Sequence, residues 1–94
     1  MSSPSAGHER TLRIVNKYGL HARPAAEFVK LASRFACDIR VCKEEVEVNG
    51  KSIMGVMMLA AECGSAITVR AEGTDAESAL EQLEALVANR FGEE

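Results

Sequence analysis

Four short stretches of the chain alternate between apolar and polar residues, and this alternation is the strongest constraint on its fold. A period of two is typical of a strand with one buried face. The four expected strands cover residues 11–15, 37–42, 46–48 and 66–71. Only the charged turn at residues 43–45 separates the two middle strands, so we expect them to form an antiparallel hairpin. The expected apolar face of this hairpin consists of Ile39, Val41, Val46 and Val48.

A helical pattern separates the first strand from the hairpin. Apolar residues recur at helical spacing from about Ala22 to Arg34, so we expect the first helix there. Pro24 falls in its first turn, where the missing N–H has the smallest cost. The expected inward stripe is Ala25, Phe28, Val29 and Ala32.

Two further helices are expected on either side of the last strand. Ser52 is placed to cap a helix that runs to about Cys63, with Gly64 as its C-terminal stop. The last helix runs to about Arg90. The pair Thr74 and Glu77 has the spacing of a capping box at its start.

The elements therefore follow the order β-α-β-β-α-β-α. Helices that share one apolar side, together with a hairpin, predict an α+β fold with a four-stranded antiparallel sheet and three helices on one face. A chain of 94 residues accommodates one such domain, which we place at residues 10–94. The small and polar residues 1–9 are expected to form a flexible tail, with His8 solvated and without a role.

Composition excludes several classes of function. A net charge of −3 provides no basic field for nucleic acid, and no apolar run is long enough to span a membrane. The chain has an odd number of cysteines, Cys37, Cys42 and Cys63, and no C-x-x-C pair, so we expect buried or half-buried free thiols in a reducing cytoplasm. The first residues show no secretory signal, which also favours a cytoplasmic protein.

The segment Gly19–Ala26 carries the chemistry that we consider central. His21 stands where an extended segment ends and a helix begins, and Arg23 follows two positions later. The first N–H groups of a helix have no intrahelical partners, and the helix dipole is positive there, so the place suits an anion. From residue type alone, a structural cap and a catalytic group are equally supported, and a Cys–His pair stays open. Arg23 and the free N–H groups of the helix start favour the second role, in which His21 is a nucleophile that takes up a phosphoryl group. Nothing near His21 in the sequence indicates a metal site.

The second expected helix is apolar on every side. Val56, Leu59 and Cys63 share one face, and Ile53, Met54, Met57 and Met58 share the opposite one. Because a domain of this size has little material to cover both faces, we expect a methionine-rich docking surface for partner proteins.

The residues before this helix allow two interpretations of Ser52. The hydroxyl is either a plain helix cap or a site that accepts a phosphate. The run Gly50-Lys51-Ser52 is not a nucleotide-binding P-loop, since Glu45 stands where that motif requires glycine.

Two segments resemble those of a known family. The run from Asn16 to Ala25, NKYGLHARPA, is similar to the active-site segment of HPr, the histidine-containing phosphocarrier of the phosphoenolpyruvate-dependent phosphotransferase system. The run from Gly50 to Met57, GKSIMGVM, is similar to the regulatory serine segment of that family. The resemblance covers about residues 10–92 and implies the HPr open-faced sandwich, which has the element order predicted above.

The resemblance also implies roles for individual residues. His21 matches the histidine that phosphorylated enzyme I modifies at Nδ1 and that donates the group to a histidine of an enzyme IIA. Arg23 matches the arginine that contacts the phosphoryl group. Ser52 matches the serine that an HPr kinase/phosphorylase modifies in some bacteria. Ile53, Met54 and Met57 fall where the family docks its partners.

Some alternatives remain open at this stage. The His21 segment is similar to members of the nitrogen-related branch, whereas the Ser52 segment is similar to the sugar-transport branch. A mainly regulatory interaction protein is the second hypothesis, and a small-ligand-binding or RNA-binding domain is the third. The acidic net charge and the absence of aromatic residues from the expected strands argue against RNA. We expect a monomer without cofactor or metal that acts as a phosphoryl carrier and not as a stand-alone enzyme.

Overall fold

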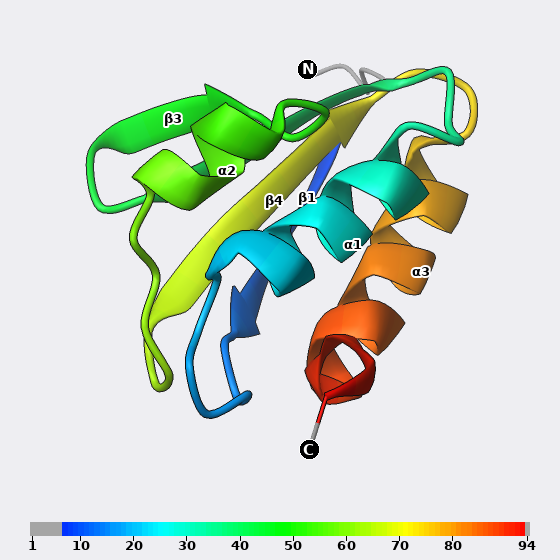
Figure 1. The fold of residues 1–94 in the computed structure, drawn as a ribbon. Coiled ribbons are helices and arrows are strands. Elements are labelled where there is room, and N and C mark those ends of the chain that lie inside the picture. Colours follow the sequence, from blue (N-terminus) through cyan, green and yellow to red (C-terminus); the bar gives the residue numbers. More distant parts are fainter. Residues whose placement is uncertain (1–6, 94) are drawn as a thin grey trace.

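Strands and helices follow one another in the predicted order, with one short 3-10 helix added at the end (Figure 1). The computed structural model describes residues 7–93. Its elements are β1 (Gly7–Arg13), α1 (Ala22–Ala32), β2 (Asp38–Lys43), β3 (Val46–Asn49), α2 (Ile53–Met58), β4 (Ala66–Glu72), α3 (Ala76–Ala88) and the 3-10 helix η1 (Arg90–Gly92).

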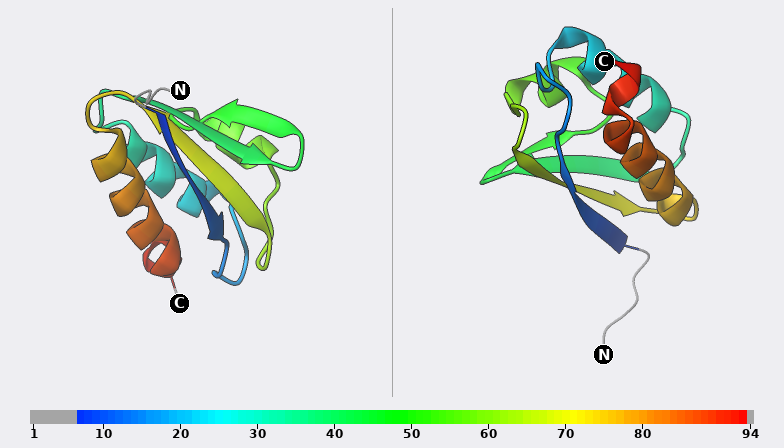
Figure 2. Two further views of the ribbon diagram at one scale, coloured as in Figure 1. Left: turned by 180° about the vertical axis from the view of Figure 1, so that it is seen from behind. Right: turned by 90° about the horizontal axis from the view of Figure 1, so that it is seen from below.

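The four strands form one antiparallel sheet in the order β1-β4-β2-β3. The long strand β4 is central, and its Val69 lies opposite Arg10 of β1 on one side and Val41 of β2 on the other. All three helices lie on one side of the sheet, as the view from below shows (Figure 2). The prediction of an α+β open-faced sandwich is therefore confirmed.

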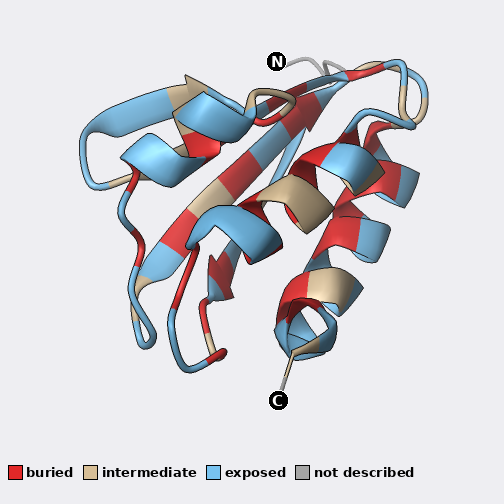
Figure 3. Cartoon of the chain, in the orientation of Figure 1, coloured by how far each residue is buried: buried red, intermediate tan, exposed pale blue. Residues whose placement is uncertain are grey.

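The core fills the layer between the sheet and the helices (Figure 3). Along β4, alternate residues are buried, and the residues between them are exposed or half-buried. α1 and α3 each bury one apolar stripe, in agreement with their helical periodicity. The largest apolar side chains with less than 2% exposure include Phe28, Ile14, Ile39, Ile67, Leu80 and Leu83.

The first strand begins earlier than the sequence indicates. We expected a flexible tail over residues 1–9, but residues 7–9 belong to β1 and pair with residues 70–72 of β4. The pairing uses backbone groups that β4 offers along its whole length, and these polar residues carry no apolar alternation to signal a strand. His8 is exposed, as expected. Residues 1–6 lie outside the described part of the chain.

The second helix is shorter than predicted and ends at Met58, not near Cys63. Ala60 adopts a φ of 51°, a left-handed conformation with which a helix cannot continue. The carbonyl of Ala61 then accepts a hydrogen bond from the Leu20 N–H at 2.9 Å, which turns the chain toward the loop before α1. Gly64 is consequently not the stop of this helix.

The shorter helix changes which residues face the core. Val56 and Leu59 are buried, as expected, whereas Cys63 is exposed on the following loop. Val46 was expected on the apolar face of the hairpin, but it is half exposed. β3 is an edge strand, and the six residues of α2 are too few to cover its whole length.

The other two helices end slightly before the predicted positions, at Ala32 and Ala88. The expected capping box at the start of α3 is wrong. Asp75, and not Thr74, is the residue before the first turn, and its side chain makes no cap hydrogen bond. Its carboxylate instead accepts the N–H groups of Ala36 at 2.8 Å and Cys37 at 2.9 Å. Asp75 thereby joins the start of α3 to the segment before β2.

The three cysteines are free thiols in different surroundings. Cys37 is buried and Cys42 half-buried, as expected, whereas Cys63 is exposed. The burial of Cys37, followed by the hydrogen bond to Asp75, raises its thiol pKa to about 11. Such a thiol is unreactive near neutral pH. Among residues 7–93 the structure shows no cluster of three potential metal ligands, and none of the helices is long and apolar enough to cross a bilayer.

Asp75→Asn should lower the stability of the domain near neutral pH, because an amide offers one acceptor oxygen to two N–H donors. The hydrogen bond from Ala36 lowers the carboxyl pKa of Asp75 in the folded state. A carboxyl with a depressed folded pKa stabilises the protein above its unfolded pKa, and this stabilisation is lost as the pH falls through the folded pKa. Urea unfolding should therefore show a wild-type advantage near pH 7 that shrinks below about pH 4.

A suitable control is Asp38→Asn, which removes an exposed carboxylate paired with Arg40. This variant should change the urea midpoint little, because exposed ion pairs contribute little to stability. A deficit of Asp75→Asn that stays constant down to about pH 2 would contradict the proposed role of the ionised carboxylate.

Candidate functional site

A tight turn between β1 and α1 fixes the position of His21. The N–H of Gly19 donates to the carbonyl of Asn16 at 3.2 Å, and the Asn16 side-chain amide donates back to the carbonyl of Gly19 at 2.7 Å. Gly19 has a φ of 69°, which glycine adopts without the steric penalty of other residues. Leu20 is buried and anchors the turn to the core. His21 follows directly at the surface.

His21 occupies the N-cap position of α1, but its side chain does not cap the helix. Its backbone is extended, and its carbonyl accepts the first helical hydrogen bond, from the Ala25 N–H at 3.0 Å. The N–H groups of Ala22 and Arg23 precede this ladder, and Pro24 has none to donate. The imidazole remains 42% exposed. The structural-cap interpretation of His21 is therefore wrong for its side chain.

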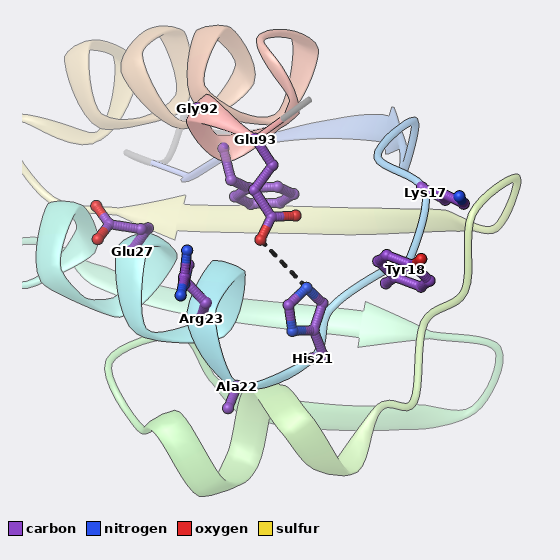
Figure 4. A pocket seen from close by; sticks show the side chains of 9 residues that line it. Lys17, Tyr18, His21, Ala22, Arg23, Glu27, Gly92 and Glu93 are labelled. Carbon is purple, nitrogen blue, oxygen red and sulfur yellow. Dashed lines mark ion pairs between the residues drawn. The ribbon is translucent and has the colours of Figure 1, made fainter.

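A hollow opens beside the imidazole (Figure 4). Side chains from the turn, the first turns of α1 and the C-terminal segment form its walls. They belong to Lys17, Tyr18, His21, Ala22, Arg23, Glu27, Phe91 and Glu93, and Gly92 completes the lining. The hollow thus places the positive charges of Lys17 and Arg23 and the carboxylates of Glu27 and Glu93 around an exposed imidazole. No cysteine lines it, so the structure gives no support to a Cys–His pair.

Tyr18 contacts His21 from the side opposite to α1. The two rings meet edge to face, with centroids 6.1 Å apart and planes at 84°. The Lys17 ammonium lies over the Tyr18 ring, 5.2 Å from its centroid. Tyr18 is 71% exposed, an unusual state for a large aromatic side chain. It forms an exposed wall next to the imidazole.

Glu93 is a residue of this site that sequence reasoning missed. Its Oε2 lies 3.2 Å from Nε2 of His21 (Figure 4). Its Oε1 accepts a hydrogen bond from the side-chain amide of Asn16 at 3.2 Å. Glu93 comes from the opposite end of the sequence, and no local spacing relates it to His21. The sequence showed only that a glutamate follows Gly92, and this gave no sign of a contact with His21.

Ser52 and the exposed part of α2 lie on a neighbouring region of the surface. The Ser52 hydroxyl accepts the N–H of Gly55 at 3.1 Å, so the prediction of a cap is confirmed. The four apolar side chains that α2 exposes are Ile53, Met54, Met57 and Met58, which we call the methionine patch. Met54 and Met58 are each 72% exposed. α2 packs against α1, the helix that His21 precedes.

Comparisons with known proteins agree with these features. A family model described as the PTS HPr component phosphorylation site matches residues 8–89. The phosphocarrier protein HPr of Cupriavidus necator is 47% identical over 85 residues, which are 90% of this chain and 96% of that protein.

Solved structures give the same result. HPr-C-His from Thermoanaerobacter tengcongensis superposes with a TM-score of 0.89 at 49% identity, over 93% of this chain and 98% of that one. The catabolite repression protein Crh of Bacillus subtilis, described as an intertwined dimer with a swapped domain, superposes with a TM-score of 0.72 at 49% identity, over 79% and 85% of the two chains. This chain therefore belongs to the HPr family of phosphocarrier proteins.

Proposed function

We propose that His21 is the residue that carries the phosphoryl group, accepting it at Nδ1 from phosphorylated enzyme I and passing it to a histidine of an enzyme IIA. The observation that carries this proposal is the position of the imidazole. It stands uncapped and exposed at the start of α1, in a hollow that Arg23 also lines. An exposed imidazole nitrogen can attack phosphorus without any rearrangement of the core.

Arg23 and the start of α1 supply the charge that the transferred group needs. A phosphoryl group on His21 adds negative charge beside the N–H groups of the first helical turn, where the helix dipole is favourable. The Arg23 guanidinium lines the same hollow and can donate two parallel hydrogen bonds to phosphoryl oxygens. These groups are present before the reaction, so little reorganisation is required when charge develops.

The methionine patch is the surface that we propose for partner docking, with Ile53, Met54 and Met57 as its main contacts. These side chains are apolar and exposed, and α2 packs against the helix that follows His21. Methionine side chains adapt to different shapes, so one patch can serve both the donor and the acceptor protein.

The second function that we propose is regulation through phosphorylation of Ser52 by an HPr kinase/phosphorylase. Ser52 is half-buried and directly precedes the exposed Ile53 and Met54. A phosphate there would add negative charge at the edge of the methionine patch and weaken the binding of enzyme I. The similarity to Crh, described as a catabolite repression protein, is consistent with such a regulatory output.

The remaining expectations are proposals of the same kind. A phosphocarrier of this kind would work in the cytoplasm, without a metal or cofactor, and without nucleic acid or membrane as partners. We also propose a monomer, although the Crh neighbour is described as a dimer. Whether the acceptors belong to sugar transport or to the nitrogen-related branch depends on which enzyme IIA proteins accept the group.

Incubation with labelled phosphoenolpyruvate and enzyme I should give one acid-labile label per chain, which His21→Ala abolishes. Arg23→Ala should slow labelling by about 10-fold to 100-fold, the equivalent of one or two hydrogen bonds to a charged group. Its unfolding midpoint should be nearly unchanged, because Arg23 is exposed. Arg34→Ala, an exposed arginine beyond the far end of α1, serves as the control. Undiminished labelling of His21→Ala would refute the proposal.

Met54→Ala should weaken the binding of enzyme I by roughly 5-fold to 30-fold, as expected for the loss of an anchoring interface side chain. Calorimetric titration measures this affinity. Gln82→Ala removes a side chain of similar length from the exposed face of α3, which α1 separates from α2 (Figure 1). Equal losses in the two variants would argue against a docking role for the methionine patch.

Ser52→Asp should weaken the binding of enzyme I more than Ser52→Ala does. Aspartate can still cap α2, but it adds negative charge, whereas alanine removes only the cap, with an effect of about 1 kcal/mol on stability. The two variants therefore distinguish the effect of negative charge on enzyme I binding from the effect of losing the helix cap. If both variants bind enzyme I as tightly as the wild type, and the phosphorylated protein does so too, regulation by charge at Ser52 is excluded.

A further inference from the structure

The C-terminal segment folds back onto the site through three successive left-handed residues. Arg90, Phe91 and Gly92 have φ angles of 57°, 54° and 80°. A left-handed conformation costs roughly 1–2 kcal/mol for a residue other than glycine, so this turn persists only because contacts hold it. The Phe91 ring is buried in the core, and the Arg90 side chain reaches the carbonyl of Val15 at 3.4 Å. These two contacts position Glu93 at the hollow.

The carboxylate of Glu93 is held at both oxygens. One oxygen faces Nε2 of His21, and the other accepts from the amide of Asn16. The Asn16 side chain is fully buried, and its nitrogen also donates to the carbonyl of Gly19. Because both neighbours of this nitrogen are acceptors, the orientation of the amide is determined by its contacts. The carboxylate therefore has a fixed place relative to the imidazole.

This contact distinguishes the two ring nitrogens. A neutral imidazole carries one proton, and the carboxylate 3.2 Å from Nε2 favours the tautomer with the proton on that nitrogen by electrostatic attraction. The other nitrogen, Nδ1, points away from Glu93, on the side of Ala22 and Arg23 (Figure 4). It retains a free electron pair in the direction of the helix start.

We infer that Glu93, supported by Asn16, is a positioning residue that holds His21 with its proton on Nε2 and leaves Nδ1 as the nucleophile. This inference rests on the proposed function of His21. In the transfer step, the Nδ1 electron pair forms the bond to phosphorus. The bond from phosphorus to the donor breaks, and its electron pair stays with the donor. The ring keeps the proton on Nε2 and gains positive charge, which the carboxylate of Glu93 stabilises.

The tautomer can be measured without any phosphoryl donor, which separates this inference from the proposed function. Ring ¹⁵N shifts of His21 in the whole chain, recorded on the alkaline plateau where they no longer change with pH, report the proton position of the neutral ring. The wild type should show a single tautomer protonated at Nε2. Glu93→Ala should show averaged shifts with less proton on Nε2, and Glu93→Gln, which retains an acceptor oxygen, should restore most of the wild-type pattern.

Kinetics give the second readout. Glu93→Ala should accept the label from enzyme I roughly 3-fold to 10-fold more slowly, because the pair is partly screened by solvent. Glu81→Ala, which removes an exposed glutamate from the middle of α3, should match the wild type in both measurements. Identical ring shifts in the wild type and Glu93→Ala would overturn the inference, even if His21 carries the label. A slower rate with unchanged shifts would also overturn it.

Discussion

The close approach of two loops determines how the rest of the site is built. One loop joins β1 to α1, and the other joins α2 to β4. The N–H of Gly64 donates to the carbonyl of Ile14 at 2.7 Å, and the N–H of Leu20 donates to the carbonyl of Ala61 at 2.9 Å. At Gly19 the loops lie so close that a Cβ atom would stand 2.4 Å from the Ala61 oxygen. Only glycine satisfies both this approach and the left-handed backbone.

This contact fixes the point at which α1 begins. With Leu20 buried and bonded to the opposite loop, the next residue has to leave the core, and the helix starts immediately afterwards. The imidazole of His21 is thus placed by backbone constraints rather than by its own packing. Such an arrangement keeps the imidazole exposed while its main chain stays in place, as the proposed transfer of a phosphoryl group requires.

Local patterns in the sequence were sufficient to predict the fold. The features that they did not predict depend on contacts between segments that are distant in the sequence. Alternation and helical periodicity identified every strand and long helix, and the setting of His21 and Ser52 followed from helix-start chemistry. The exposed methionines followed from a helix that was apolar on all sides. Glu93 could not be found in this way, because a left-handed turn around a buried Phe91 brings it to His21.

The same distinction explains two further errors. Asp75 lies at the start of α3, but its carboxylate accepts hydrogen bonds from the segment before β2. No local sequence pattern indicates that contact. Residues 7–9 form a strand because β4 offers them pairing partners. In each case the missing information was a long-range backbone or carboxylate contact, whereas apolar periodicity reports only which side of an element faces the core.

The uncovered face of the sheet differs in its chemistry from the side that the helices cover. Its side chains pair with one another across the strands: Arg70 lies 3.3 Å from both Glu9 and Glu47, and the hydroxyls of Thr11 and Thr68 are 3.1 Å apart. Charged and hydroxylated side chains at this density are well solvated and offer little apolar area for a partner. Within residues 7–93, most of the exposed large apolar side chains belong instead to the methionine patch, with Tyr18 beside His21. A partner that binds through apolar contacts would therefore meet the helical side of the sheet, where the exposed imidazole of His21 also lies.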